Sequence, residues 1–264
     1  MKKFKNIAVV FVSIVAILSV MGLAEANRQD VKFSDLKVDI DVSDGNYFIN
    51  DLDIESQVFA HGYQTGKEPM VNLDLKALEK QFDEMPSVKK AEVYTTLNGM
   101  LKVDIKQRTP IARVFTKTSS FYLDKAGYVM PLSDKYTAKV PVVNGDLNID
   151  YSVVAGLNFA KENQLTQKNF EAKKLVEAYQ LAYKFMSVPF WDAQFKQIYF
   201  KEDGDVELIP AVGNHVILID GSNDIEESLT KLMILYKEGL RKTGWNNYRV
   251  INLKYKDQIV CIKR

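Results

Sequence analysis

Three Ser-x-x-Lys sequences and one Lys-Thr-Gly triplet are the parts of this chain whose residue types and spacing could support covalent chemistry. They are Ser34 with Lys37, Ser87 with Lys90, Ser228 with Lys231, and Lys242-Thr243-Gly244. In penicillin-binding enzymes such motifs supply a serine nucleophile, a lysine base and a strand that lines the site. The remaining motif of that set, Ser-x-Asn, does not occur in the sequence. The triplet also falls at a predicted helix end, where lysine suits the helix dipole and glycine the cap, so we expect no transpeptidase activity.

The other reactive side chains do not group into a site either. His61 lies at a predicted helix end and His215 begins a predicted strand, and neither has a second imidazole or a thiol at metal-ligand spacing. Asp203 and Asp205 flank a glycine, as a turn requires. No glycine-rich phosphate loop occurs. The sequence therefore predicts no catalytic residue, no metal and no cofactor, and a protein that is not an enzyme.

The N-terminus predicts that most of the chain lies outside the cytoplasm. Three lysines within residues 1–5 precede an uncharged run over residues 6–24, close to the roughly 20 residues that a helix needs to cross a bilayer. We expect a cytoplasmic tail at 1–5, a single transmembrane helix at 6–24 in the inner (plasma) membrane, and extracytoplasmic domains after it. A cleaved signal peptide is the alternative, because Ala24-Glu25-Ala26 has the small-x-small form of a cleavage site.

Composition narrows the class of protein further. The single cysteine, Cys261, cannot form an internal disulfide, so the exported part must be held together by its core. The chain has 35 Lys and Arg and 34 Asp and Glu, interspersed along the sequence. This balance gives no nucleic-acid footprint, and we found no motif for a small-molecule substrate.

Residues 32–107 predict a compact α+β module. A strand with alternating Leu36, Val38, Ile40 and Val42 is followed by helices near 51–60 and 75–85. Two alternating runs around Asn98-Gly99 then predict a hairpin in which both turn residues take positive φ. Both helices should cover one face of the three-stranded sheet, with Val93 and Val103 facing them and Lys102 on the other face.

Residues 108–264 predict a β-rich domain with inserted helices. The helices are expected near 168–187 and 224–243, the second with Asn223 and Glu226 as a capping pair. The first should place Ala172, Leu175, Val176, Tyr179, Ala182, Tyr183 and Met186 on its buried stripe. Its solvated side should then carry Lys173, Lys174, Glu177 and Lys184. Strands are expected near 195–200, 205–209 and 215–219, and a closing hairpin at 248–255 and 258–262.

Several stretches resemble one known family. They are Ser87–Val93, Leu101–Ile105, Gln107–Arg113, Phe121–Gly127 and Val250–Tyr255. Together with the element order after a single anchor, they are similar to the FtsQ/DivIB family of bacterial cell-division proteins, whose first extracytoplasmic module is a POTRA domain. The resemblance covers the anchor, the module and the domain junction, and is mostly architectural beyond about residue 145.

The resemblance implies a non-enzymatic, single-pass scaffold of the divisome that holds other division proteins at the septum. The partners it implies are small membrane proteins resembling FtsB and FtsL. The alternative is a periplasmic chaperone or an outer-membrane assembly component that uses a POTRA module to bind its client.

The resemblance also points to the end of the chain as the partner-binding segment, because the last strand of this family and its neighbourhood dock a partner strand. The residues are Tyr255, Lys256, Gln258, Ile259, Val260, Cys261 and Ile262. Four consecutive apolar residues, 259–262, exceed what a strand with one solvent face needs. The segment is therefore either covered on both faces within its own domain, or an edge strand that Lys263 and Arg264 guard against self-pairing.

Overall fold

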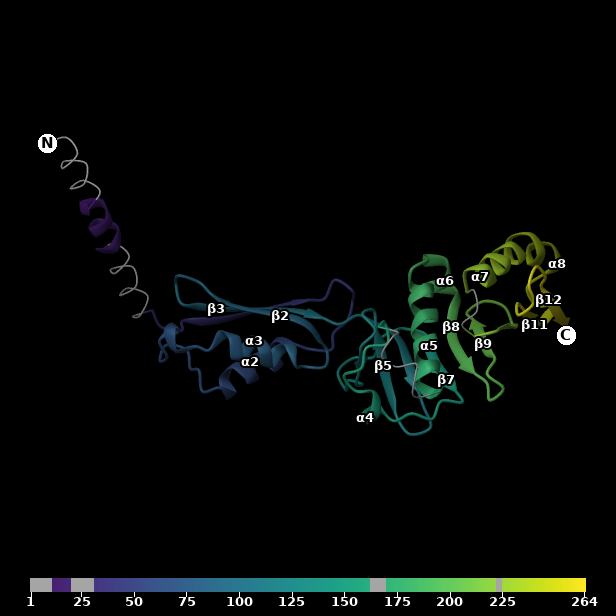
Figure 1. Cartoon of the computed structure of the whole chain (residues 1–264), viewed down its shortest axis with the longest axis horizontal. Coiled ribbons are helices and arrows are strands. Elements are labelled where there is room, and N and C mark those ends of the chain that lie inside the picture. The colour runs from purple at the N-terminus through teal and green to yellow at the C-terminus, as the bar shows by residue number, and fades with distance from the viewer. Residues whose placement is uncertain (1–10, 20–30, 162–169, 222–224) are drawn as a thin grey trace. The chain divides into compact units, whose positions relative to one another are not determined.

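A computed structural model describes residues 11–19, 31–161, 170–221 and 225–264 (Figure 1). The chain divides into two compact units, Met1–Gln107 and Arg108–Arg264. The predicted tail 1–5 and cleavage site at 24–26 lie outside the described residues, as does much of the predicted span 6–24. Its described part, residues 11–19, is helical. Among the described residues, no helix combines the length and apolarity of a membrane span.

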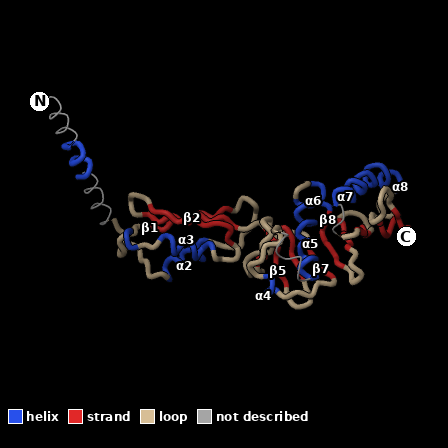
Figure 2. Tube along the Cα trace, in the orientation of Figure 1, coloured by secondary structure: helices blue, strands red, loops and turns tan. Residues whose placement is uncertain are grey.

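The first unit contains a three-stranded sheet with two helices. The strands are β1 (Asp35–Asp41), β2 (Val88–Thr95) and β3 (Met100–Gln107), in the order β1-β3-β2. β1 runs parallel to β3, and β2 runs antiparallel to it. The predicted order of strand, helix, helix, strand, strand is confirmed (Figure 2).

Helix α2 (Asp51–Ala60) and helix α3 (Leu75–Asp83) follow β1, with the short helix η1 (Met70–Asn72) between them. A capping box starts α2, because Asn50 and Asp53 each accept a bond from the other's main-chain N–H. The helices and the sheet share a core of fully buried side chains. The helices contribute Ile54, Val58, Leu78 and Phe82, and β3 contributes Leu101 and Val103.

The turn between β2 and β3 differs from the prediction. Gly99 has φ +84°, but Asn98 is not among the residues with positive φ. Thr96 O accepts the N–H of Gly99 at 3.1 Å, and Thr96 donates its own N–H to Met100 O at 2.9 Å. Thr96 Oγ1 also accepts the N–H of Met100. The loop is thus longer than two residues, because the threonine side chain supplies an acceptor for the N–H that a two-residue turn would have paired with main chain.

A buried amide at the end of β3 fixes the loop that follows β1. Gln107 is 5% exposed. Its Oε1 accepts the N–H groups of Phe48 and Ile49, and its Nε2 donates to the carbonyls of Asp41 and Asn46. One side chain thereby satisfies four main-chain groups that burial would otherwise leave unpaired.

The register of the module gives a stability prediction. Val93 lies opposite Val103 and both are buried, as predicted, whereas Lys102 lies on the other face beside the Tyr94 ring. We expect Val103→Asp to lower the free energy of unfolding by about 3 kcal/mol or more, because it buries an unpaired charge. Lys102→Glu should change it by less than about 0.5 kcal/mol. Urea unfolding measures both, and equal losses in the two variants would contradict this register.

The second unit is built on a nine-stranded sheet. Its strand order is β12-β11-β10-β9-β8-β7-β4-β5-β6. The strands are β4 (Pro110–Phe115), β5 (Ser120–Asp124), β6 (Val129–Met130), β7 (Val142–Gly145), β8 (Phe195–Phe200), β9 (Val206–Pro210), β10 (Val216–Ile219), β11 (Tyr248–Asn252) and β12 (Val260–Lys263). Strands β8 to β12 lie close to the predicted ranges, whereas no range was predicted for β4 to β7. Pro110 begins β4, where its missing N–H is tolerated.

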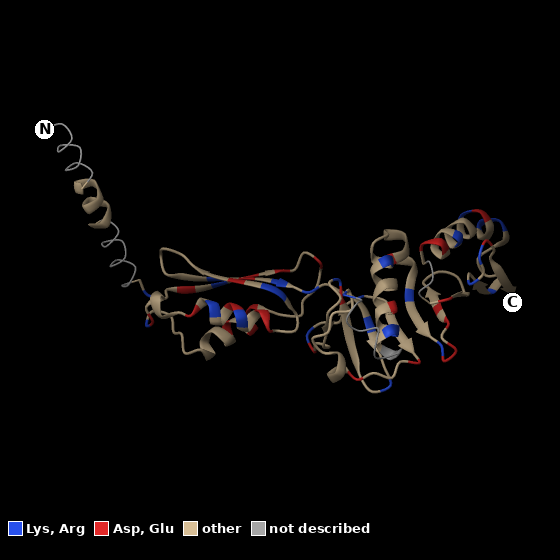
Figure 3. Ribbon diagram, viewed as in Figure 1, with Lys and Arg blue, Asp and Glu red and all other residues tan. Residues whose placement is uncertain are grey.

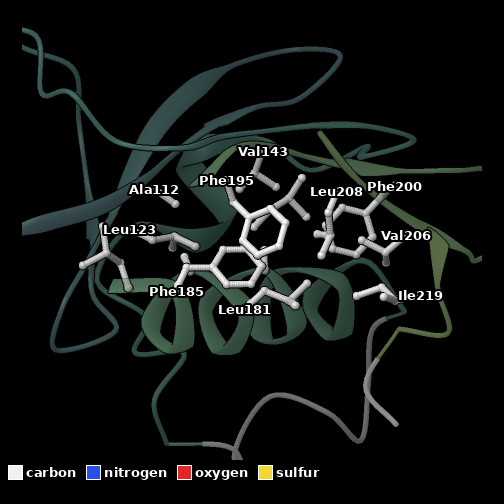
Figure 4. Close-up of a cluster of buried hydrophobic side chains, with 14 of the residues drawn as sticks. Ala112, Leu123, Val143, Leu181, Phe185, Phe195, Phe200, Val206, Leu208 and Ile219 are labelled. Atoms are coloured by element: carbon white, nitrogen blue, oxygen red, sulfur yellow. The ribbon is translucent and has the colours of Figure 1, made fainter. Parts of the chain in front are cut away.

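The second unit also contains the helices α4 (Tyr151–Val154), α5 (Phe170–Met186), α6 (Pro189–Gln194), α7 (Ile225–Ile234), η3 (Leu235–Leu240) and α8 (Arg241–Thr243). All of them except α8 contribute apolar side chains to the core of this unit. Figure 4 shows Leu181 and Phe185 of α5 against Phe195 and Val143 of the sheet. The predicted single helix over 224–243 is wrong in detail, because η3 is a π-helix that interrupts it. Asn223, the predicted cap, lies outside the described residues.

The buried stripe of α5 also differs from the prediction. Leu181 and Phe185 are fully buried, while Tyr183, predicted to be buried, is 42% exposed. Lys174 and Glu177, predicted to be solvated, are 5% and 8% exposed. Lys174 Nζ donates to Asp146 Oδ2 at 2.9 Å, so the charge is buried as a pair.

A tight turn in this unit accounts for one of the family-like stretches. Asp124 is 2% exposed, and its Oδ1 accepts the N–H of Tyr128 at 2.7 Å. Its Oδ2 accepts from Arg108 Nη1 at 3.0 Å. Gly127 has φ +87°, and a Cβ there would lie 2.4 Å from Ala160 N. The Asp and Gly of this stretch are therefore required by the fold rather than by a reaction.

Glu177 is a buried carboxyl group. Its Oε1 makes no hydrogen bond with a described residue, and a Cβ on Gly221 would lie only 2.3 Å from that atom. Burial raises the pKa of Glu177 to about 7, Lys173 lowers it and Asp220 raises it further. The folded state therefore favours the protonated form of this side chain.

This pKa predicts a pH dependence of stability. Because the folded protein binds the Glu177 proton more tightly than the unfolded chain, this contribution is present at low pH and is lost as the pH rises through about 7. Glu177→Gln should therefore be more stable than wild type at pH 8.5, by about 2 kcal/mol, and the difference should shrink towards pH 5. Urea unfolding across this range measures it. Glu202→Gln, at an exposed position, is the control, and a constant difference between wild type and Glu177→Gln would contradict the prediction.

Candidate functional site

The last strand, β12, lies at one edge of the nine-stranded sheet. β11 pairs in parallel with β10 and antiparallel with β12. β12 has no neighbour on its other side in the sheet. Its outer side therefore presents main-chain groups that can pair with another strand.

The side chains of β12 show that the segment is not covered on both faces. Val260 is 39% exposed and Ile262 is 46% exposed. Cys261, between them, is partly buried against the core, as is Ile259. The four apolar residues thus divide between a buried inner face and an exposed outer face.

The exposed outer face continues inward from β12 as an apolar row. The register aligns Ile262 with Val250, and Val250 with Val216. A second row aligns Val260 with Asn252 and Leu218. Sequence reasoning missed these rows, because neighbours across a sheet are set by register and not by distance along the chain.

The direction of the main-chain groups can be assigned on β12. Arg264 donates its N–H to Asn247 O at 3.2 Å, towards β11. Because N–H groups alternate in direction along a strand, those of Ile262 and Val260 also point towards β11. The N–H groups of Cys261 and Lys263 then point to the free side.

The remaining predicted binding residues lie in the turn before β12. Tyr255 is 48% exposed, and Lys256 and Gln258 are exposed. Asp257 has φ +60°, the only non-glycine residue with positive φ in the described chain. All seven predicted binding residues are thus together on one turn and one edge strand, and their role in binding stays a prediction.

Lys231, the lysine of one Ser-x-x-Lys sequence, holds this turn in place. Its Nζ donates to Tyr255 O at 2.9 Å and to Leu253 O at 3.3 Å, and it pairs with Glu227 at 3.2 Å. These contacts direct the ammonium group of Lys231 to two carbonyls and a carboxylate, and they give the lysine of this motif a structural part in the fold.

The two C-terminal basic residues play different parts. Arg264 Nη2 donates to Asn214 O at 2.6 Å, which fixes the end of β12 to the loop before β10. Lys263 is exposed and makes no ion pair with any described residue. Both predicted guard residues keep their positive charge, and Arg264 is held in place by its hydrogen bond to Asn214.

Both histidines contact neighbouring side chains. His215 is 2% exposed, its Nε2 lies 3.0 Å from the Tyr236 hydroxyl, and Trp245 packs near its ring. Burial lowers the pKa of His215, so the ring is neutral at neutral pH. His61 Nε2 contacts Gln81 Oε1 at the end of α2. Among the described residues, no group of three or more His, Cys, Asp or Glu is placed to hold a metal.

Basic residues outnumber acidic ones in the last part of the chain, where Figure 3 shows both kinds. Residues 235–264 contain eight Lys and Arg but two Asp and Glu, although the chain as a whole has a net charge of +1. The net charge of the whole chain does not reveal the excess of basic residues in this segment. The edge therefore combines an apolar outer face, free N–H groups and positive charge.

Two family models match this chain. A model described as FtsQ/DivIB, C-terminal related, matches residues 109–262. The chain belongs to the FtsQ/DivIB family. A POTRA-like domain model matches residues 32–106, in the first unit. The family match thus covers the sheet that carries β12.

A curated relative agrees with this family. The chain is 27% identical over 196 residues to the cell division protein FtsQ of Geotalea daltonii. The aligned region is 74% of this chain and 65% of that relative, so the chain spans less than two thirds of the relative's length.

The role of Lys231 gives a prediction that separates a structural from a catalytic Ser-x-x-Lys. We expect Lys231→Met to lower the free energy of unfolding by about 2 kcal/mol, because it leaves two carbonyls without a donor. Amide hydrogen exchange in residues 253–263 should also become faster. Ser228→Ala should change stability by less than about 0.5 kcal/mol. The assignment would be wrong if Lys231→Met left both stability and exchange unchanged.

Proposed function

We propose that this chain is a non-enzymatic scaffold of the bacterial division machinery that binds another division protein through the free edge of β12. The observation that carries the proposal is this edge, with exposed Val260 and Ile262, in the part of the chain that matches the FtsQ/DivIB family. Recruitment of a partner needs no catalytic group and no metal, and the described residues hold no metal-binding cluster.

A partner strand that pairs with β12 would form a tenth strand of the sheet. Main-chain bonds to Cys261 and Lys263 would supply affinity, and alternate side chains would supply specificity. On the outer face, apolar partner residues would pack beside Val260 and Ile262. The basic surroundings favour a partner segment that carries acidic residues.

The partners would be single-span division proteins resembling FtsB and FtsL. The uncharged run 6–24 would anchor the chain in the inner membrane, with the N-terminus in the cytoplasm and the two units outside it. The protein would then work at the division septum. A fluorescent fusion at midcell supports this role, whereas uniform envelope labelling in dividing cells supports the assembly-component alternative.

The direction of the β12 N–H groups determines which substitution tests docking at this edge. Cys261→Pro removes an N–H on the free side of β12 and leaves the bonds to β11 intact. Cys261→Ser is its matched control, because it changes the side chain but keeps the N–H. Val260→Pro is unsuitable, since that N–H faces β11.

We expect the full chain with Cys261→Pro to lose its division-protein partner in co-purification after crosslinking in cells. Cys261→Ser should retain the partner at the wild-type level. Circular-dichroism melting should be the same for both variants. Undiminished co-purification with a folded Cys261→Pro variant would rule out docking at this edge.

A further inference from the structure

The first unit has an open sheet edge of its own, at β1. β1 pairs with β3 on one side only. The opposite edge of the same sheet is closed, because the β2 N–H groups of Ala91 and Val93 donate to Asp83 Oδ1 at 2.7 Å and Glu79 Oε2 at 3.3 Å. Side chains of α3 thus occupy the β2 edge, and the β1 edge is left for another strand.

A groove of about 560 Å³ runs along the β1 edge. Its apolar lining comes from β1, from the segment after β1 and from the first turn of α2. It includes Val38, Ile40, Val42, Tyr47 and Leu52. Val42, Tyr47 and Leu52 are 39%, 57% and 70% exposed. A strand laid along β1 would bury these side chains on one of its faces.

The β1 edge is strongly acidic. Residues 35–55 contain seven Asp and Glu and one lysine. Asp39 and Asp51, which line the groove, are exposed and make no ion pair with a described residue. The occupant must therefore be an extended segment that is apolar on one face and carries positive charge.

The same chain presents a strand of this chemistry. β12 exposes Val260 and Ile262 on one face, has the uncompensated Lys263 on the other, and lies in the segment with net charge +6. The other sheet edge of the second unit is the two-residue strand β6, whose residues are both buried. Of the four edges in the two described sheets, β1 and β12 are thus open, and they are opposite in charge.

We propose that β1 of one copy pairs with β12 of a second copy, which joins the two sheets across a head-to-tail contact. Val260 and Ile262 pack on the side of Val38 and Ile40, against the exposed Leu52 of α2. Cys261 and Lys263 then fall on the side of Lys37 and Asp39. Such a contact is heterologous, so it can extend into open chains or close into a ring, a reciprocal dimer being the smallest. It uses the same strand as the proposed partner, so the partner and the second copy compete for β12.

The single cysteine makes this contact measurable by disulfide crosslinking. The full chain carrying Lys37→Cys, or Asp39→Cys, is oxidised in cells with copper-phenanthroline and separated without reductant. Because each copy then has one thiol on β1 and Cys261 on β12, head-to-tail pairing gives a ladder of dimers, trimers and longer chains. Thr118→Cys, at an exposed turn position of the second unit, is the matched control and should give no ladder.

Several results would overturn the proposal. A crosslink within one chain would appear as a monomer of altered mobility, and Cys261–Cys261 pairing as a dimer that wild type also forms. The proposal would also be overturned if the β1 variants gave neither a ladder nor a monomer of altered mobility. Adding Cys261→Ser must abolish the ladder.

Substitutions that reverse the charge of Asp39 or Lys263 provide a second, independent test. In the Lys37→Cys chain, Asp39→Lys should reduce the crosslinked fraction several-fold, and so should Lys263→Glu. The two changes together should restore it, because the attraction is re-formed with opposite signs. No loss in the single variants, or no recovery in the double variant, would contradict the contact. Asp39→Lys leaves β12 intact, so partner co-purification should persist in it, which separates failure of this contact from failure of the partner-docking role.

Discussion

Main-chain hydrogen bonding at strand edges is the constraint on which the rest of this structure depends. Every interior strand pairs on both sides, and each edge needs a separate solution. At β2 the carboxylates of Asp83 and Glu79 accept the outward N–H groups. At β6 the strand is two residues long and buried. β1 and β12 have neither protection, and the two proposed contacts both arise from that difference.

Buried polar groups support the elements that present these edges. Gln107 satisfies four main-chain groups beside β1, and Lys231 holds the turn before β12 through two carbonyls. Removing either side chain would leave main-chain groups of these loops without their hydrogen-bond partner. The proposed function therefore depends also on residues that place the edge strands.

Charge is distributed along the chain in a way that its total conceals. An acidic segment at 35–55 and a basic segment at 235–264 carry opposite charges of equal size, within a chain of net charge +1. Because charges separated by more than about 10 Å are largely screened at physiological salt, local groups and not the total determine what an edge attracts. The two proposed contacts both depend on this distribution.

The sequence by itself determined the elements whose signals are local. Period-two alternation gave the β2–β3 hairpin and the facing of Val93 and Val103, and the short family-like stretches gave the family. Local signals also placed Lys242-Thr243-Gly244 at a helix end, and the structure has Gly244 after the last helical residue with φ +92°.

Tertiary structure decided what depends on neighbours distant in the chain. The register that aligns Ile262, Val250 and Val216, the edge position of β12 and the burial of Lys174 and Glu177 all follow from contacts across many residues. A helix stripe alone could not reveal that Asp146 would pair with Lys174. Periodicity shows which side chains share a face, but only the packed sheet shows which face is covered and which edge is free.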